Sequence, residues 1–293
     1  MSVVTAEIDQ WNSLQAQAQE LKLASAFKTF NDAGIEAIVI KGWAAARKYP
    51  SSRVRRPGDI DLAVSPGDYD RAREFIHRPD IAKFNIDLHK GLRQLDPVEW
   101  SDLFVHSMLV DLKGTQVRIL CEEDHLRVLS THWLIDGGGY RDKLWDIYYA
   151  VENRSPDFDW DRCLNVVSTV RRGWVVCAIA LAHRYLGLSV DGLPFSNELG
   201  SIPKWIADCL EIEWRRAERL EPILTSTHDK GLLVRQIARR LPPNPIRATI
   251  EADGDLYGNR RWVYQAQVIG RRAMPFVRDL LSFAKLKVRG TGT

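Results

Sequence analysis

The chain has 293 residues, of which 45% are hydrophobic and 27% charged, and its formal net charge is +3. These values are ordinary for a globular chain long enough for two domains, and so mild a charge gives no sign of a nucleic-acid-binding protein. Because no apolar run could cross a bilayer and no signal-peptide pattern opens the chain, we expect a cytoplasmic protein with no membrane contact.

The cysteines give no sign of a metal site or of a disulfide framework. They lack the paired Cys or Cys/His spacing that holds zinc, and they are Cys121, Cys163, Cys177 and Cys209. We therefore expect reduced thiols, as in most proteins of the cytoplasm.

Helix and strand patterns alternate in the first part of the chain. Residues 6–30 predict a helix, with apolar side chains at helical spacing at Trp11, Leu14, Ala18, Leu21, Ala24 and Phe27. Residues 36–40 are short, apolar and β-branched, which predicts a buried strand. That strand turns at Gly42 into a short helix, and a basic loop over 50–58 leads to a second predicted strand over 59–65.

The predicted sheet ends near residue 120. The sheet is completed by a strand over 83–89 and a hairpin over 108–120, and a helix over 67–77 connects the second and third strands. The later patterns are helical, over 122–134, 142–151, 159–170, 174–186, 203–219 and 230–240. We therefore predict an α+β chain, in which residues 1–120 form a small mixed sheet with flanking helices and residues 121–293 form a helical domain.

Two aspartates share one face of the second predicted strand. Asp59 and Asp61 alternate with the apolar Ile60, Leu62 and Val64. Neighbouring carboxylates repel each other, and a divalent cation that prefers hard oxygen ligands, such as Mg²⁺, is the usual reason to place them together. The alternative is an edge strand whose solvated face carries two acids by chance.

Three features around the pair favour a metal site. The turn at Gly42 lies one short helix and one loop upstream, and Asp87 adds an acid in the middle of the third predicted strand. The third feature is a group of basic residues, which are Lys41, Arg47, Lys48, Arg53, Arg55 and Arg56.

Short motifs run through this region in a fixed order, as Lys41-Gly42, Tyr49-Pro50, an arginine just before Gly58-Asp59-Ile60-Asp61-Leu62, and Asp87-Leu88-His89. They resemble the polymerase-beta-type nucleotidyltransferase superfamily, and within it a bacterial group of uncharacterised nucleotidyltransferases. The likeness extends more weakly to about residue 165, through Leu144-Trp145-Asp146-Ile147. Trp43 is a departure, because the superfamily usually has serine after this glycine.

The resemblance implies a nucleotidyltransferase fold and the transfer of an NMP group from an NTP such as ATP. Asp59 and Asp61 are then expected to hold two Mg²⁺ ions, and Asp87 to complete the second metal site or to act as the base. Asp111 is a weaker candidate for the third acid.

The donor phosphates are expected at the glycine turn. Backbone N–H groups at Gly42 and Trp43 suit a triphosphate, and Lys41 adds a point charge there, unless it only extends from the strand end into solvent. An arginine before the acid pair is expected to contact phosphate. Arg55 and Arg56 both fit this position, and the choice between them stays open.

Several other polar residues have open roles. His89 shares a strand face with Asp87, so it either contacts the acceptor or metal-bound water, or is structural. Asp146 is expected to pair with a nearby arginine. His125 and His132 are seven residues apart on one predicted helix, and packing is the commoner role of such histidines.

The acceptor is expected to be a hydroxyl or phosphate of a small molecule, peptide or protein, with natural-product tailoring as one option. The helical domain over 121–293 is expected to complete the cleft for acceptor and nucleotide. Some superfamily members modify aminoglycosides, and others are toxins that modify tRNA. RNA is not favoured here, since only residues 260–289 offer a basic stretch. The competing hypotheses are a catalytically inactive module that senses nucleotides or binds a partner, and a toxin-like enzyme that modifies tRNA.

Overall fold

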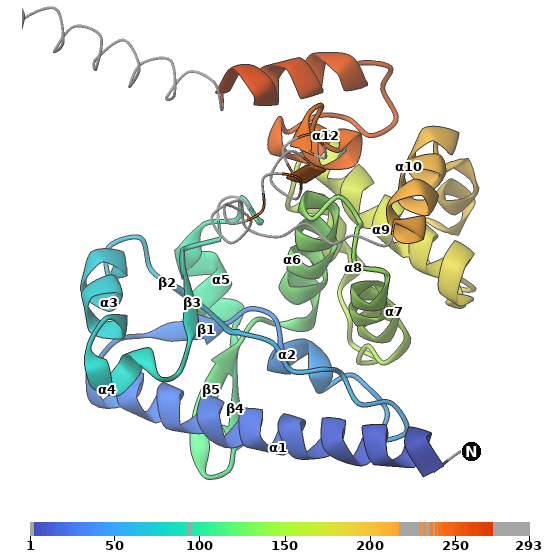
Figure 1. Cartoon of the computed structure of the whole chain (residues 1–293). Helices are drawn as coiled ribbons and strands as arrows, with labels where there is room; N and C mark the ends of the chain where they lie inside the picture. The colour runs from blue at the N-terminus through green and yellow to red at the C-terminus, as the bar shows by residue number, and fades with distance from the viewer. Residues whose placement is uncertain are drawn as a thin grey trace, which may run out of the picture. The chain divides into compact units, whose positions relative to one another are not determined.

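The computed structural model describes residues 3–92, 95–216 and 240–271, and single positions 229, 231, 235, 236 and 238 (Figure 1). It confirms the predicted α+β class, with a five-stranded mixed sheet followed by helices. Parts of the predicted helix over 230–240, and the basic stretch after residue 271, lie outside the described residues. Among the described helices, none is both long and apolar enough to cross a membrane.

The strand order in the sheet is β3-β2-β1-β5-β4. The central strand β1 (Ala37–Val39) pairs antiparallel with β2 (Ile60–Val64) and parallel with β5 (Thr115–Ile119). The edge strands are β3 (Ile86–Lys90), which is parallel to β2, and β4 (Met108–Leu112), which forms the predicted hairpin with β5. The parallel pairing of β2 and β3 brings the acidic strands side by side.

Helix α1 (Val3–Asp32) covers the sheet with its C-terminal half. Leu23, Phe27 and Phe30 are buried in one core with strand residues such as Leu62 and Val117. By contrast, Trp11, Leu14 and Leu21 of the same apolar pattern are exposed. A helix of this length spans about 45 Å and a five-residue strand only about 17 Å, so the sheet cannot cover the whole helix.

Short helices connect the strands. Helix α2 (Trp43–Ala46) follows β1, and α3 (Tyr69–Ile76) and α4 (Pro79–Ala82) lie between β2 and β3. Helix α5 (Trp100–His106) precedes β4. The predicted helix over 67–77 is therefore confirmed as α3, and the short helix behind the Gly42 turn as α2.

The helices after β5 are α6 (Glu122–Ile135), α7 (Leu144–Glu152), α8 (Trp160–Asn165), α9 (Thr169–Leu186), α10 (Lys204–Arg215) and α12 (Pro245–Glu251), with 3-10 turns η1 (Arg141–Lys143) and η2 (Ser196–Ser201). The sequence pattern placed the start of α9 too late, because Ser168 begins it by accepting a hydrogen bond from the Arg171 backbone N–H. In the same way the Asp159 carboxylate caps α8. Gly187, at φ 75°, ends α9.

The chain divides into two compact units. One contains residues 1–132 and 142–200, and the other contains 133–141 and 201–293. Helices α7, α8 and α9 thus belong to the same unit as the sheet, so the predicted boundary near residue 120 does not coincide with this division. That the later helices complete an acceptor cleft stays a prediction.

The second unit is organised around close packing at Gly138. Its φ is 67°, and a Cβ there would lie 2.1 Å from Leu210 Cδ2 and 3.2 Å from the Trp133 ring. The Gly138 carbonyl also accepts a hydrogen bond of 2.8 Å from Trp214 Nε1. Only glycine leaves room for these contacts.

Candidate functional site

Two of the predicted acids lie opposite each other because β2 and β3 are parallel neighbours. In their register Asp61 pairs with Asp87, and Ala63 pairs with His89. Residues paired in this way point to the same face of a sheet, as do residues two apart along one strand. The side chains of Asp61, Asp87 and His89 therefore meet on one face.

These three side chains form a group with the chemistry of a metal site. One ligand atom from each lies within 4.8 Å of the other two. His89 Nε2 is 3.2 Å from Asp87 Oδ2 and 3.7 Å from Asp61 Oδ1. The geometry of these contacts does not make either of them a hydrogen bond. Two carboxylates and an imidazole nitrogen at this spacing fit a divalent cation.

Asp59 lies one residue before β2 and outside this group. Its exposed carboxylate accepts a hydrogen bond of 2.7 Å from Asn85 Nδ2. Asn85 sits just before β3 with φ 50°, a left-handed conformation that asparagine tolerates better than most residues. The role of Asp59 as a metal ligand stays a prediction.

Lys41, directly after β1, places its ammonium against Asp61. Its Nζ lies 2.8 Å from Asp61 Oδ1, and only 9% of its side chain is exposed. The lysine therefore does not extend its charge into solvent. Burial raises the pKa of the Asp61 carboxyl, but His89 and the Lys41 ammonium outweigh this effect and lower the pKa to about 2.

Gly42 brings the backbone close to both acids. Its φ of 62° and ψ of −113° are strained for any residue with a side chain. A Cβ here would lie 3.4 Å from the Asp59 carbonyl oxygen and 3.8 Å from Asp61 Oδ2. The turn predicted from the sequence thus lies directly beside the acid pair.

A cavity of about 200 Å³ opens beside this turn. It lies among α1, α2 and the basic loop over 50–58, and its lining includes Gly42, Trp43, Arg47, Arg53, Arg56 and Asp59. The Trp43 indole faces α1, where its Nε1 lies 3.4 Å from Glu20 Oε1. The space suits a base or a sugar more than a whole nucleotide.

The basic loop is attached to α7 through Arg55. Its Nε and Nη2 donate to the two Asp146 carboxylate oxygens at 2.7 Å and 2.9 Å, and Tyr49 Oη donates to Oδ1 at 2.6 Å. The predicted pairing of Asp146 with an arginine is confirmed. Arg55 is held in a two-point ion pair with a buried acid, whereas Arg56 is exposed, and both arginines line the cavity.

A second contact fixes the same loop. The Arg53 guanidinium carbon lies 3.9 Å from the centre of the Trp145 ring. Alternate loop residues Arg53 and Arg55 are thus held by the adjacent α7 residues Trp145 and Asp146. We call this arrangement of Tyr49, Arg53, Arg55, Trp145 and Asp146 the loop clamp.

One family model matches the segment that contains Asp59 and Asp61. Residues 6–83 match the model of a family described as uncharacterised nucleotidyltransferase. The resemblance predicted from the sequence motifs is confirmed over this nucleotidyltransferase segment, which includes Lys41, Gly42, Asp59 and Asp61. No curated protein and no solved structure matches the chain.

The match supports nucleotidyl transfer as a general class of reaction. The match ends at residue 83, before Asp87. The pairing of β2 with β3 is what places this third acid beside Asp61. The loop clamp likewise joins this segment to α7, which lies outside the match.

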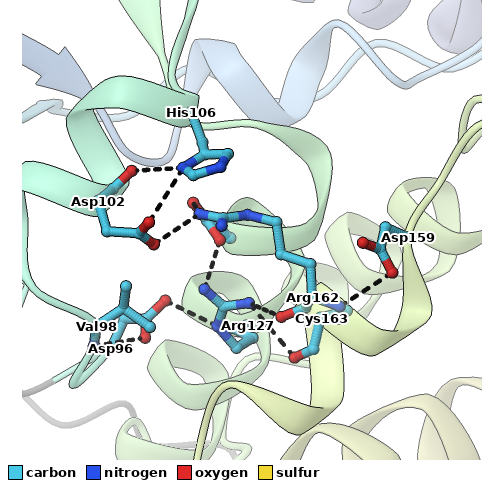
Figure 2. A network of polar contacts seen from close by, with 9 residues as sticks. Asp96, Val98, Asp102, His106, Arg127, Asp159, Arg162 and Cys163 are labelled. Atoms are coloured by element: carbon cyan, nitrogen blue, oxygen red, sulfur yellow. Dashed lines mark hydrogen bonds and ion pairs between the residues drawn. The ribbon is translucent and has the colours of Figure 1, made fainter.

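A buried polar network lies outside the nucleotidyltransferase segment (Figure 2). Arg127 on α6 donates to Asp96 at 2.9 Å and also to Asp124, and all three side chains are at least 98% buried. Arg162 on α8 bridges Asp124 at 2.7 Å and Asp102 at 3.2 Å. The network joins α5, α6, α8 and the segment after β3.

Sequence reasoning missed this network and the Asn85 contact. Asp124 and Arg127 are three apart on a predicted helix, which indicates a side-chain pair, but nothing indicated that the pair would be buried. His125, on the same helix, is buried as expected of a packing histidine. Burial lowers the pKa of His125 to about 4, an effect that Asp146 opposes.

Proposed function

We propose that the chain is a Mg²⁺-dependent nucleotidyltransferase that moves an NMP group from an NTP to a hydroxyl or phosphate of an acceptor. The observation that carries the proposal is the register of β2 and β3, which sets Asp61 opposite Asp87. This pair lies beside the glycine turn of a segment that matches a nucleotidyltransferase family. A cytoplasmic location is part of the proposal and rests on composition.

Asp61 and Asp87 are the residues we expect to hold Mg²⁺, with Asp59 as a further ligand. When bound, Mg²⁺ would neutralise charge on the triphosphate and lower the pKa of the attacking hydroxyl. His89 lies close enough to both acids to act as a ligand or to bind a water of the ion.

Phosphate binding would fall to the backbone and to exposed cations. The turn at Gly42 lies beside the acids, where the N–H groups of Gly42 and Trp43 would bind phosphate, and Arg47 and Arg56 line the adjoining cavity. Arg55 is instead assigned a positioning role, because both of its donor edges toward α7 are taken by Asp146. Both arginines line the cavity, and this assignment favours Arg56, which is exposed, for the phosphate contact.

The acceptor is a small molecule, peptide or protein in this proposal, and RNA stays less favoured. Transfer of a nucleotidyl group needs positioning and charge neutralisation more than covalent work by the protein. The chain's own contribution is therefore to align the α-phosphate with the acceptor between the turn at Gly42 and the edge strand β3.

Calorimetry with each of the four NTPs, with and without Mg²⁺, tests the proposal. We expect one NTP to bind in a Mg²⁺-dependent way, and Asp61→Asn to weaken that binding about tenfold or more, since the carboxylate's charge is lost. Asp70→Asn is the matched control, because Asp70 is an exposed acid on α3. If no NTP binds at millimolar concentration, the alternative of a partner-binding module takes precedence.

A further inference from the structure

The contact between Lys41 and Asp61 is unusual for a surface ion pair. The Lys41 side chain is 9% exposed and that of Asp61 is 15% exposed, and their charged atoms are 2.8 Å apart. Lysine is almost never so buried unless its ammonium is paired. Removing either partner would leave a charge in a poorly solvated place, so this pair is a fixed part of the site.

We propose that the Lys41 ammonium takes the place of a second divalent cation, so that the site accepts one ion instead of two. This inference rests on the proposed function. The ammonium contacts Asp61, which the superfamily resemblance assigns to metal binding. Lys41 directly precedes the glycine turn, so its charge lies on that side of the acid.

The contacts of the carboxylate oxygens support a site for one ion. In a two-ion site the ions lie about 3.5–4 Å apart and share carboxylate ligands. Here Lys41 engages Asp61 Oδ1, and Asn85 engages Asp59 Oδ1 at 2.7 Å. If Asp61 bridged two ions, one of them would lie beside the Lys41 ammonium, and the two positive charges would repel each other.

The charge balance points the same way. Three ionised acids at Asp59, Asp61 and Asp87, together with the Lys41 ammonium, give the site two net negative charges. In the nucleotide-free site one divalent cation neutralises these two charges, whereas a second would leave two positive charges around a buried lysine. With a neutral residue in place of Lys41, one carboxylate charge would stay uncompensated and could bind a second ion.

A Mn²⁺ titration of the full chain, followed by the EPR signal of the free ion, tests the inference. It is made with Mn²⁺ alone and with an equimolar non-hydrolysable analogue of the NTP that binds. We expect the wild-type chain to saturate at one Mn²⁺ per chain. Lys41→Met, which keeps the length of the side chain without its charge, is expected to bind the first ion about tenfold more tightly. It should also accept a second ion, with the spectrum of a coupled Mn²⁺ pair.

Two variants separate charge from structure. Lys41→Arg keeps the positive charge and is expected to stay at one ion. Lys90→Met removes a lysine at the end of β3 that faces Tyr69 and does not contact the acids, and it is expected to bind Mn²⁺ as the wild type does. Thermal unfolding with and without Mn²⁺ reports whether each variant folds, because an ion bound only by the folded state raises its melting temperature.

Two coupled ions in the wild-type chain, or a Lys41→Met variant with unchanged stoichiometry and affinity, would overturn the inference. Parallel NTP turnover separates this result from a failure of the proposed function. Turnover with two bound ions would leave the nucleotidyltransferase standing and remove only the role of Lys41. No Mn²⁺ binding and no turnover would remove both.

Discussion

At the scale of single residues, His125 is a buried titratable group beside the loop clamp. Its Nε2 has no hydrogen-bond partner, and burial lowers its pKa to about 4, while Asp146 raises the pKa and Arg55, Lys48 and Arg47 lower it further. In the unfolded chain the pKa of histidine is about 6.5, so the unfolded state takes up a proton between pH 6.5 and 4 and the folded state does not.

Folding stability linked to His125 is therefore complete above pH 6.5 and lost as the pH falls toward 4. We expect the wild-type chain to lose about 3 kcal/mol of unfolding free energy through this group across that window. Urea unfolding at pH 7 and at pH 4.5 measures it. His125→Leu should remove most of the loss, and His77→Gln, at an exposed histidine of α3's C-terminus, should keep it. Equal pH dependence in wild type and His125→Leu would contradict this account.

At the scale of elements, the loop clamp decides how the basic loop is presented. Asp146 accepts three hydrogen bonds from Tyr49 and Arg55, and its side chain is 7% exposed. Removing one partner of such a pair leaves the other charge poorly solvated. Replacing both partners avoids that cost, because no buried charge is left alone.

We expect Asp146→Ala to lower the unfolding free energy by about 3 kcal/mol, and to weaken NTP binding because the loop that carries Arg56 is no longer fixed. The double variant Asp146→Ala/Arg55→Met should be more stable than Asp146→Ala alone. Tyr49→Phe, which removes a single hydrogen bond, is expected to cost about 1 kcal/mol. Urea unfolding of the wild type, Asp146→Ala, Arg55→Met and the double variant gives the coupling free energy of the Asp146–Arg55 pair, and additive effects would exclude the clamp.

The sequence predicted the elements of this region better than their contacts. Apolar periodicity identified α1, the two acidic strands and the hairpin, since each has a regular alternation of its own. The periodicity could not tell that Arg55 meets Asp146, which lies 91 residues away, or that Asn85 meets Asp59. It also could not tell where the sheet stops covering α1, so Trp11, Leu14 and Leu21 entered the apolar pattern although they are exposed.

At the scale of the whole molecule, the site belongs to a compact unit that extends beyond the family match. The acids lie on a two-strand edge of the sheet, and the compact unit that contains it continues to residue 200. Within that unit, the Arg127 network ties the segment after β3 to α6 and α8 (Figure 2). Composition indicated two domains, but only the folded contacts assign α7, α8 and α9 to the unit of the sheet.

The Arg127 network should therefore contribute to the stability of that unit and not to nucleotide binding. Burial raises the pKa of Asp96 despite the nearby Arg127 guanidinium, so this acid depends on its partner. Arg127→Met leaves Asp96 and Asp124 buried without that partner and is expected to lower the unfolding free energy, measured in urea, by about 3–5 kcal/mol.

Lys28→Met is the control, because Lys28 forms an exposed pair with Asp32, and it should lower the unfolding free energy by at most about 0.5 kcal/mol. Binding is then measured at a low temperature at which the Arg127→Met variant is folded. We expect the folded variant to bind the NTP with unchanged affinity. Weakened binding by the folded variant would show that the network also positions the site.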